Sequence, residues 1–425
     1  MNIKHIIKQS LLSIPYIRRY VDQVQSLRLE VTSKEEQIER LKNLITHSRS
    51  PALFNSLDDF STERLLSHPA IHPLPNTRIG SEEALDNPNR IKVAERLLNA
   101  YHQSLGDEKK SNLNRNGEDL WTGILRDELP DLMEAIDKGN AKKLADYLRD
   151  FGKSFVWFGG VTTCIDGYNR NLDPKQVSLT YLDKLVCLGE SLGILRFENP
   201  ENGPWGNNLQ VNVDQLINDI EQVLNISISP PLNIIHTDGL TTDKGLFHYR
   251  HIHGLYSAIR IAKLTNCQGR VCELGGGIGI TAMYSRRLGI LDYTLLDLPI
   301  TCLLAGHYLL HSIGLDDVVL YGESNSSGSI KILPYWECVN LKHKNYKLTI
   351  NQDSLPEIDD NLIQEYLVQI RRITTDFFLS INHECFHPKT VNNFIQKETG
   401  YKQLYRHKCW IREGYLEELY RIQAM

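Results

Sequence analysis

The stretch Val271–Gly279, which reads VCELGGGIG, decides how the second half of this chain folds. An apolar run typical of a buried strand ends at Leu274, and three consecutive glycines follow, with a fourth two residues on. Glycines let the backbone adopt positive φ and pass close to a ligand. Residues 280–287 then have the pattern of a helix, whose first N–H groups are free to bind a ligand. In an open α/β sheet such a turn lies at the carboxyl end of a strand, where ligands bind.

A second signal lies one strand further along. Residues 293–296 form a short apolar run that ends at Asp297, and Leu298-Pro299 follow. A carboxylate at this strand end can accept hydrogen bonds from both ribose hydroxyls of an adenosine. Asp297 lies 20 residues after Gly277, a spacing that also suits a nicotinamide dinucleotide, and residues 277–282 fit the pattern G-x-G-x-x-A. The glycines alone therefore leave two cofactors open.

Glu273 favours S-adenosylmethionine over a dinucleotide. It stands two residues before the first glycine, where its carboxylate would repel a pyrophosphate and could hold the ammonium of an aminoacyl group. A dinucleotide fold also needs a second mononucleotide half, and no second glycine fingerprint follows in the sequence. We therefore expect an S-adenosylmethionine site. A dinucleotide oxidoreductase and a tight turn without a ligand are the alternatives.

The wider pattern after Pro230-Pro231 is that of an α/β domain. Short apolar runs alternate with helical segments, which predicts right-handed βαβ units and a parallel sheet. Strands are expected at residues 270–274, 293–296, 318–321, 346–350 and 377–381, and helices at residues 247–264, 280–287, 300–313, 361–372 and 389–399. Residues 403–410 and 415–422 predict a terminal antiparallel hairpin. The expected fold class is a Rossmann-like, doubly wound sheet.

The residues before Pro230 predict a different organisation. Residues 46–89 are rich in Ser, Pro, Asn and His and have the composition of a linker. Helices are expected at residues 91–105, 129–136, 142–151, 177–192 and 213–223, with Asn212 as the cap of the last. We therefore divide the chain into an N-terminal helical arm (1–47), a mainly helical domain that covers the active site (48–230) and a cofactor-binding domain (231–425).

The N-terminal arm has apolar residues at heptad spacing. One heptad position holds Ile17, Val24, Val31, Ile38 and Ile45, and the other holds Tyr20, Leu27 and Leu41. β-Branched residues at the first position with leucine at the second favour a parallel dimer. A homodimer through this helix and a helix packed against the body are both open.

Composition excludes several classes of protein. The net charge of −5 leaves no overall basic surface for nucleic acid. The sequence contains no run of eighteen apolar residues, so no transmembrane helix is expected. The N-terminus lacks the pattern of a secretory signal. The eight cysteines contain no C-x-x-C pair and are expected to be free thiols. A cytoplasmic location is expected, with attachment to the inner face of a membrane as the alternative.

With these residues in view, a resemblance can be stated. The stretch 273–279 with Asp297-Leu298-Pro299 resembles the class I S-adenosylmethionine-dependent methyltransferases. The C-terminal half is more specifically similar to a bacterial family of sugar O-methyltransferases, through LPYW (333–336), INQDSLPE (350–357), INHE (381–384) and WIREGYLEELY (410–420). The resemblance implies that the cofactor contacts Glu273, Gly275, Gly277, Gly279 and Asp297. It also implies that Leu298 lines the adenine and that Glu323 accepts a hydrogen bond from the adenine amino group.

Methyl transfer to an alcohol needs a group that removes the hydroxyl proton. His383, at the end of the fifth strand, is the first candidate for the base, because an imidazole can accept a proton near neutral pH. Asp353, after the fourth strand, is the second, and a helix cap is its alternative role. Asp353, Glu357 and Glu384 could instead hold Mg²⁺ through oxygen ligands.

Several aromatic and basic residues are expected in the same region. His248, His251 and His253 crowd the start of one helix, and we expect them to line the cofactor or acceptor site rather than bind a metal. Tyr249 and Arg250 are expected beside them. Trp157 and Trp205 could stack on a sugar, although packing in the core is the simpler role.

The sequence therefore predicts an O-methyltransferase for a sugar hydroxyl in glycan or natural-product assembly. Two alternatives stay open: a methyltransferase for a non-sugar hydroxyl or a nitrogen, and a non-catalytic protein that binds S-adenosylmethionine and acts as a scaffold.

Overall fold

A computed structural model describes most of the chain beyond residue 74. The described residues are 75–111, 113, 129–153, 173–199, 201, 206–324, 329–384 and 390–423, together with residues 24, 27, 31 and 34. The chain divides into two compact units, Met1–Phe60 and Ser61–Met425. In the first unit the four described residues are helical, and Leu27 and Val31 expose about half of their surface (53% and 55%). Whether this helix pairs with a second copy stays a prediction.

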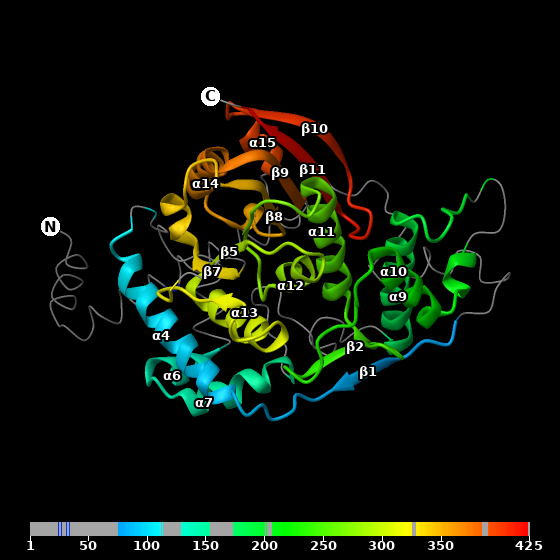
Figure 1. The fold of residues 1–425 in the computed structure, drawn as a ribbon, viewed down its shortest axis with the longest axis horizontal. Helices are drawn as coiled ribbons and strands as arrows, with labels where there is room; N and C mark the ends of the chain where they lie inside the picture. Colours follow the sequence, from blue (N-terminus) through cyan, green and yellow to red (C-terminus); the bar gives the residue numbers. More distant parts are fainter. Residues whose placement is uncertain are drawn as a thin grey trace, which may run out of the picture. The chain divides into compact units, whose positions relative to one another are not determined.

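The second unit contains an eight-stranded sheet with the order β10-β11-β9-β8-β4-β5-β7-β6 (Figure 1). Its strands are β4 (Val271–Leu274), β5 (Tyr293–Asp297), β6 (Val318–Val319), β7 (Ile330–Pro334), β8 (Tyr346–Gln352), β9 (Thr374–His383), β10 (Tyr401–Lys408) and β11 (Tyr415–Ile422). Six neighbouring strands of this sheet are parallel to one another: β9, β8, β4, β5, β7 and β6. β11 is antiparallel to both of its neighbours, which confirms the predicted terminal hairpin.

Helices cover both faces of this sheet. The helices α11 (Tyr249–Thr265), α12 (Ile280–Arg287) and α13 (Pro299–Ser312) pack with one face, and α14 (Asp360–Ile373) and α15 (Val391–Ile395) pack with the other. Neighbouring strand residues alternate between two apolar clusters: Val271 and Leu295 belong to the first, Cys272 and Leu296 to the second. This alternation is expected for strands buried on both faces, so the predicted doubly wound sheet is present.

The described part of the chain before α11 includes five helices at or near the predicted positions. It contains α4 (Arg90–Glu108), α6 (Pro130–Asp137), α7 (Ala141–Arg149), α9 (Pro174–Ser191) and α10 (Val213–Leu224), and short 3₁₀ turns at Phe151–Lys153 and Asn207–Gln210. The side chain of Asn212 accepts a hydrogen bond from the Gln215 N–H, which confirms it as the cap of α10.

The sequence did not predict a second, three-stranded sheet. It consists of β1 (Ile79–Glu82), β2 (Thr237–Thr242) and β3 (Gly245–Phe247), in antiparallel order β1-β2-β3. These strands are short and rich in Gly, Ser and Thr, so they lack the alternating apolar pattern that identifies a strand. β1 lies within the expected linker, and its partner β2 lies beyond Pro230-Pro231. The three-part division of the chain stays a prediction.

The sequence also did not predict one strand of the large sheet, β7. β7, rather than the predicted strand at 318–321, pairs with β5. The observed β6 keeps only two residues of that prediction and lies at the edge of the sheet. In β7 the polar Lys331 breaks the apolar run and a proline ends it, so five residues gave too weak a signal.

The described cysteines, Cys187, Cys267, Cys272, Cys302, Cys338 and Cys409, are free thiols, as expected. Among the described helices, none is long and apolar enough to span a membrane.

Candidate functional site

The glycine loop joins β4 to α12 at the carboxyl end of the central strand. Gly275, Gly277 and Gly279 have φ values of 72°, 57° and 87°. A Cβ atom at Gly275 would lie 2.1 Å from Ser354 Oγ, and one at Gly279 would lie 2.6 Å from Leu309 Cδ1. Positive φ and these close approaches both require glycine. The loop therefore has the tight backbone expected where a cofactor lies against the start of a helix.

Asp297 ties the end of β5 to this loop. Its Oδ2 accepts a hydrogen bond from the Gly277 N–H at 2.9 Å, and its Oδ1 accepts one from the Leu298 N–H at 2.7 Å. The side chain is half-buried, as is that of Leu298, which precedes the first turn of α13. The two separate sequence signals thus meet at one place. Contacts of Asp297 with a ribose, and of Leu298 with adenine, stay predictions.

Glu273 lies directly beneath the glycine loop. It is fully buried, and its oxygens accept hydrogen bonds from Tyr293 Oη and Gln352 Nε2, both at 2.8 Å. Burial raises the pKa of Glu273 to about 7, and the charge of Asp297 adds to this effect, although the two hydrogen bonds oppose it. A Cβ atom at Gly276 would lie 2.8 Å from Glu273 Oε2, so the carboxyl group packs against the loop. Direct contact with a cofactor stays a prediction.

Glu323 has a structural partner that the sequence did not reveal. Arg96 of α4 binds both of its carboxylate oxygens, each at 2.7 Å, and the Leu320 N–H donates to it at 2.9 Å. Although burial acts in the opposite direction, these contacts lower the pKa of Glu323. Glu323 therefore joins α4 to the loop after β6, and its predicted contact with adenine remains untested.

Asp353 follows β8 with a φ of 59°, which is unusual for a residue with a side chain. Its Oδ1 accepts a hydrogen bond from Tyr415 Oη at 2.5 Å, and its Oδ2 accepts one from Arg412 at 2.6 Å. Arg250 of α11 approaches the same oxygen at 3.5 Å. Burial alone would raise the pKa of Asp353, but the two arginines and these hydrogen bonds lower it to about 2.

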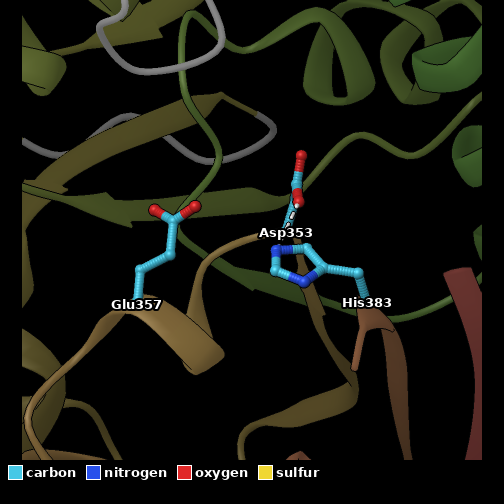
Figure 2. A group of neighbouring side chains, drawn as sticks. All are labelled: Asp353, Glu357 and His383. Carbon is cyan, nitrogen blue, oxygen red and sulfur yellow. Dashed lines mark ion pairs between the residues drawn. The ribbon is translucent and has the colours of Figure 1, made fainter. Parts of the chain in front are cut away.

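His383 and Glu357 lie beside Asp353 (Figure 2). The three residues each offer one ligand atom, and these atoms lie within 4.8 Å of one another. His383 Nε2 is 3.8 Å from Asp353 Oδ1, which is an ion-pair distance rather than a hydrogen bond. Burial and the charge of Asp353 raise the pKa of Glu357 to about 8. The structure thus brings together both predicted catalytic residues.

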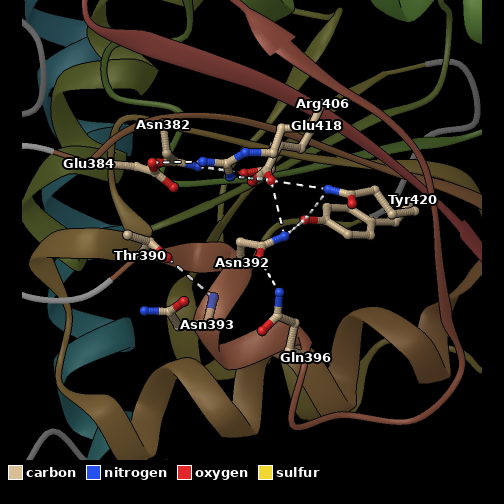
Figure 3. A network of polar contacts seen from close by, with 11 residues as sticks. Asn382, Glu384, Thr390, Asn392, Asn393, Gln396, Arg406, Glu418 and Tyr420 are labelled. Atoms are coloured by element: carbon tan, nitrogen blue, oxygen red, sulfur yellow. Dashed lines mark hydrogen bonds and ion pairs between the residues drawn. The ribbon is translucent and has the colours of Figure 1, made fainter.

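The predicted set of metal ligands needs one correction. Glu384 points to Arg406 of β10 at 2.7 Å, and Figure 3 shows this ion pair in a network with Glu418 and Asn392. The group that the structure assembles is Asp353, Glu357 and His383, the only candidate metal group among the described residues. Two carboxylates and an imidazole suit a divalent cation. The two arginines on Asp353, however, add positive charge where a cation would bind.

The three histidines of α11 do not converge on a metal. His248 caps the helix by accepting from the Arg250 N–H at 3.2 Å, and His251 contacts Tyr284 Oη at 3.3 Å. Burial lowers the pKa of His251 to about 3. Both ring nitrogens of His253 are buried without a hydrogen-bond partner. Trp157 and Trp205 lie outside the described residues.

The sequence missed Arg412 and Tyr415, which hold Asp353. Arg412 lies in the turn between β10 and β11, and Tyr415 is the first residue of β11, so both are far from Asp353 in the chain. The Arg412 guanidinium lies 3.6 Å from the centre of the Tyr415 ring. The stretch 410–420 stood out in the sequence only through the resemblance, which assigned these residues no role.

Comparisons with known proteins give little further information. No protein-family model matches the sequence, and no curated protein matches it. Among solved structures, the chain is similar to the PH0226 protein from Pyrococcus horikoshii OT3, with 12% identity and a TM-score of 0.33 over 43% of this chain and 93% of that one.

A second similar structure is the Burkholderia thailandensis 1,6-didemethyltoxoflavin-N1-methyltransferase with bound 1,6-didemethyltoxoflavin and S-adenosylhomocysteine. It has 13% identity and a TM-score of 0.29 over 40% of this chain and 79% of that one. At such low scores these similarities decide neither fold nor function, so both are argued from the strands and side chains above.

Proposed function

We propose that this chain is an S-adenosylmethionine-dependent O-methyltransferase whose acceptor is a sugar hydroxyl. The observation that carries the proposal is the union of two features at one edge of the sheet. The glycine loop and Asp297 lie at the carboxyl ends of β4 and β5, and Asp353 and His383 lie at the ends of β8 and β9. Ligands of open α/β sheets bind along this edge.

The sheet also argues against the dinucleotide alternative. In a dinucleotide fold of the usual strand order 3-2-1-4-5-6, the strand beside the fifth strand is parallel to it. Here an antiparallel pair, β11 and β10, follows β9 instead. The turn between β10 and β11 supplies Arg412 to the site, and the start of β11 supplies Tyr415. The scaffold alternative does not explain why Asp353 is held in a left-handed conformation between two arginines, since strain of this kind clusters at functional sites.

The chain's own residues have separable tasks in this proposal. S-adenosylmethionine, when bound, supplies an already activated methyl group. The glycine loop and Asp297 bind and orient the cofactor, and His383 takes the proton from the acceptor hydroxyl at a ring nitrogen. Asp353, with a pKa of about 2, is a poor base at neutral pH. It therefore orients His383 and stabilises the positive charge that the imidazole gains.

The sugar is the part of the proposal that rests on the resemblance of residues 333–420. Mg²⁺ is an alternative to the general base: it would be held by Asp353, Glu357 and His383, and His383 would then not be the group that takes the proton. Because Arg250 and Arg412 repel a cation, we expect any Mg²⁺ to bind weakly at this group.

Calorimetric titration with S-adenosylmethionine, S-adenosylhomocysteine and NAD⁺ tests the cofactor, with Asp297→Ala as the variant. Asp292→Ala is the matched control, because Asp292 lies just before the opposite end of β5. We expect both sulfur compounds to bind to the wild type and to the control, and to bind much more weakly to Asp297→Ala. Binding of NAD⁺ alone would contradict the proposal. A screen of sugars against non-sugar alcohols then tests the acceptor.

A further inference from the structure

Helix α9 belongs to the helical region before the sheet, yet it carries a buried cation that reaches the site. The side chain of Lys184 is only 7% exposed and forms an ion pair with Glu413. Glu413 lies in the turn between β10 and β11, next to Arg412. In Figure 1 this turn, in red, reaches down toward α11 and α9. The helical region therefore contacts the sheet at the loop that carries Arg412.

That loop holds Asp353 from one side. Arg412 is 8% exposed and donates to Asp353 Oδ2, and Tyr415 donates to Oδ1. The loop is closed by two backbone hydrogen bonds, from Cys409 N–H to Tyr415 O at 2.8 Å and from Tyr415 N–H to Arg412 O at 3.2 Å. A shift of Glu413 would therefore move both groups that bind the carboxylate.

Helix α9 also supports the other side of Asp353. The ring of Tyr181 packs against that of Tyr249, with centres 5.7 Å apart. The Arg250 guanidinium lies 5.1 Å from the centre of the Tyr249 ring and 3.5 Å from Asp353 Oδ2. Helix α9 thus contacts the surroundings of both arginines that approach Asp353: it pairs with Glu413, next to Arg412, and its Tyr181 ring lies tilted against the Tyr249 ring beside Arg250.

A buried lysine is an unusual way to stabilise a fold. Removing an ammonium from water is costly, and Glu413, whose side chain is 39% exposed, offsets only part of that cost. An ion pair fixes a direction and a partner, however, which apolar packing does less well. The position of Lys184 is therefore better explained by placement of the loop than by stability.

We propose that Lys184 is a positioning residue: its ion pair with Glu413 fixes the β10–β11 turn and, through Arg412 and Tyr415, orients Asp353 toward His383. This role rests on the proposed function, in which His383 and Asp353 handle the acceptor proton. The helical region then does more than cover the site, because it sets the geometry of the acidic group.

Hydrogen exchange read by mass spectrometry tests this inference without an acceptor. In Lys184→Met, we expect peptides covering residues 409–415 and 351–357 to exchange roughly tenfold faster, because local contacts hold both segments closed. Lys184→Arg keeps the charge and should restore near wild-type exchange. Lys244→Met removes a different ion pair, with Glu221, and should leave both segments unchanged. Faster exchange at 409–415 alone would overturn the inference.

A second variant distinguishes a general loss of stability from local opening of residues 351–357. Lys184→Met with Glu413→Leu removes both charges and leaves neither buried alone. If Lys184→Met accelerates exchange throughout the second unit, the double variant should recover global protection while residues 351–357 stay fast. Wild-type exchange at those residues in the double variant would contradict the positioning role. Titration with S-adenosylmethionine is run in parallel: failure of the wild type to bind it would refute the proposed function, whereas the exchange result judges Lys184.

Discussion

The two halves of the site are built in different ways. The proposed cofactor half is local: one loop of five residues meets one strand end through hydrogen bonds from the Gly277 N–H to the Asp297 carboxylate and from the Gly275 N–H to the Leu296 carbonyl. The proposed acceptor half is assembled from β8, β9, α11 and the β10–β11 turn, and α9 contacts that turn. Backbone geometry dominates the first half, and charges on side chains dominate the second. Substitutions should therefore act through sterics in one half and through electrostatics in the other.

The largest effect is expected at Gly275. Gly275→Val places a Cβ 2.1 Å from Ser354 Oγ at a φ of 72°, so the loop must move. We expect affinity for S-adenosylmethionine, measured by calorimetry, to fall by about 100-fold or more, since about 3 kcal/mol of strain is enough for this. Gly289→Ala is the control, because it has a φ of 91° but nothing within 4 Å. It should lower stability by about 1 kcal/mol and leave affinity unchanged.

Asp353→Asn should have the next largest effect, and it acts on turnover rather than on cofactor binding. It keeps the shape of the side chain but leaves Arg412 without a charged partner. We expect the rate of methyl transfer to fall by about 100-fold, as for misplaced catalytic groups, with S-adenosylmethionine bound as in the wild type. Equal loss of cofactor affinity would show that the two halves are not separable.

The pKa of Asp353 also predicts acid sensitivity. Because its pKa falls from an ordinary value near 4 to about 2 in the folded chain, the carboxylate stabilises the fold above pH 4, and this contribution is lost as the pH falls toward 2. The contribution is of the order of 2 kcal/mol. The difference in free energy of unfolding between wild type and Asp353→Asn should therefore shrink between pH 5 and pH 2. A constant difference would contradict the assignment.

Glu357 predicts the opposite trend with pH. Its pKa is raised to about 8, so the folded chain holds a proton that the unfolded chain releases above about pH 4.5, and this cost to stability grows up to pH 8. Glu357→Gln should raise the melting temperature at pH 8 and have little effect near pH 4.5. Bound Mg²⁺ would reverse this, making the wild type the more stable protein at pH 8 in a magnesium buffer. Full activity after treatment with EDTA would remove Mg²⁺ from the proposal.

The smallest effect on activity is expected in the N-terminal unit. Leu27→Asp with Val31→Asp places charges on exposed apolar positions of the heptad. If this helix forms a dimer, light scattering should show a shift from dimer to monomer, while the affinity for S-adenosylmethionine stays unchanged. Lys34→Asp is the control, because Lys34 falls at the same heptad position as Leu27 and Leu41 and is already charged. A wild-type chain that is already monomeric would refute the predicted homodimer.

The same contrast explains what the sequence could and could not predict. Glycines before a helix and an acid after the next strand are local signals, so the cofactor loop and the βαβ order were predicted. Asp353 and His383 were chosen because strand ends of a parallel sheet meet at one edge. Arg412, Tyr415 and Lys184 were not found, because only the tertiary fold brings them to Asp353. Glu384 was misplaced for a related reason: its partner, Arg406, is on a strand 22 residues later.

The small sheet has a consequence for any attempt to shorten this protein. β1 pairs with β2, and Ser81 bonds to His236 although the two are 155 residues apart. The segment between β1 and β2, which contains the helices α4 to α10, therefore begins and ends at two strands that are hydrogen-bonded to each other. Bringing the two ends of so long a segment together costs conformational entropy, and the β1–β2 pairing offsets this cost. A fragment that begins near residue 230 would lack β1 and would expose β2 as an unpaired strand edge, which favours aggregation.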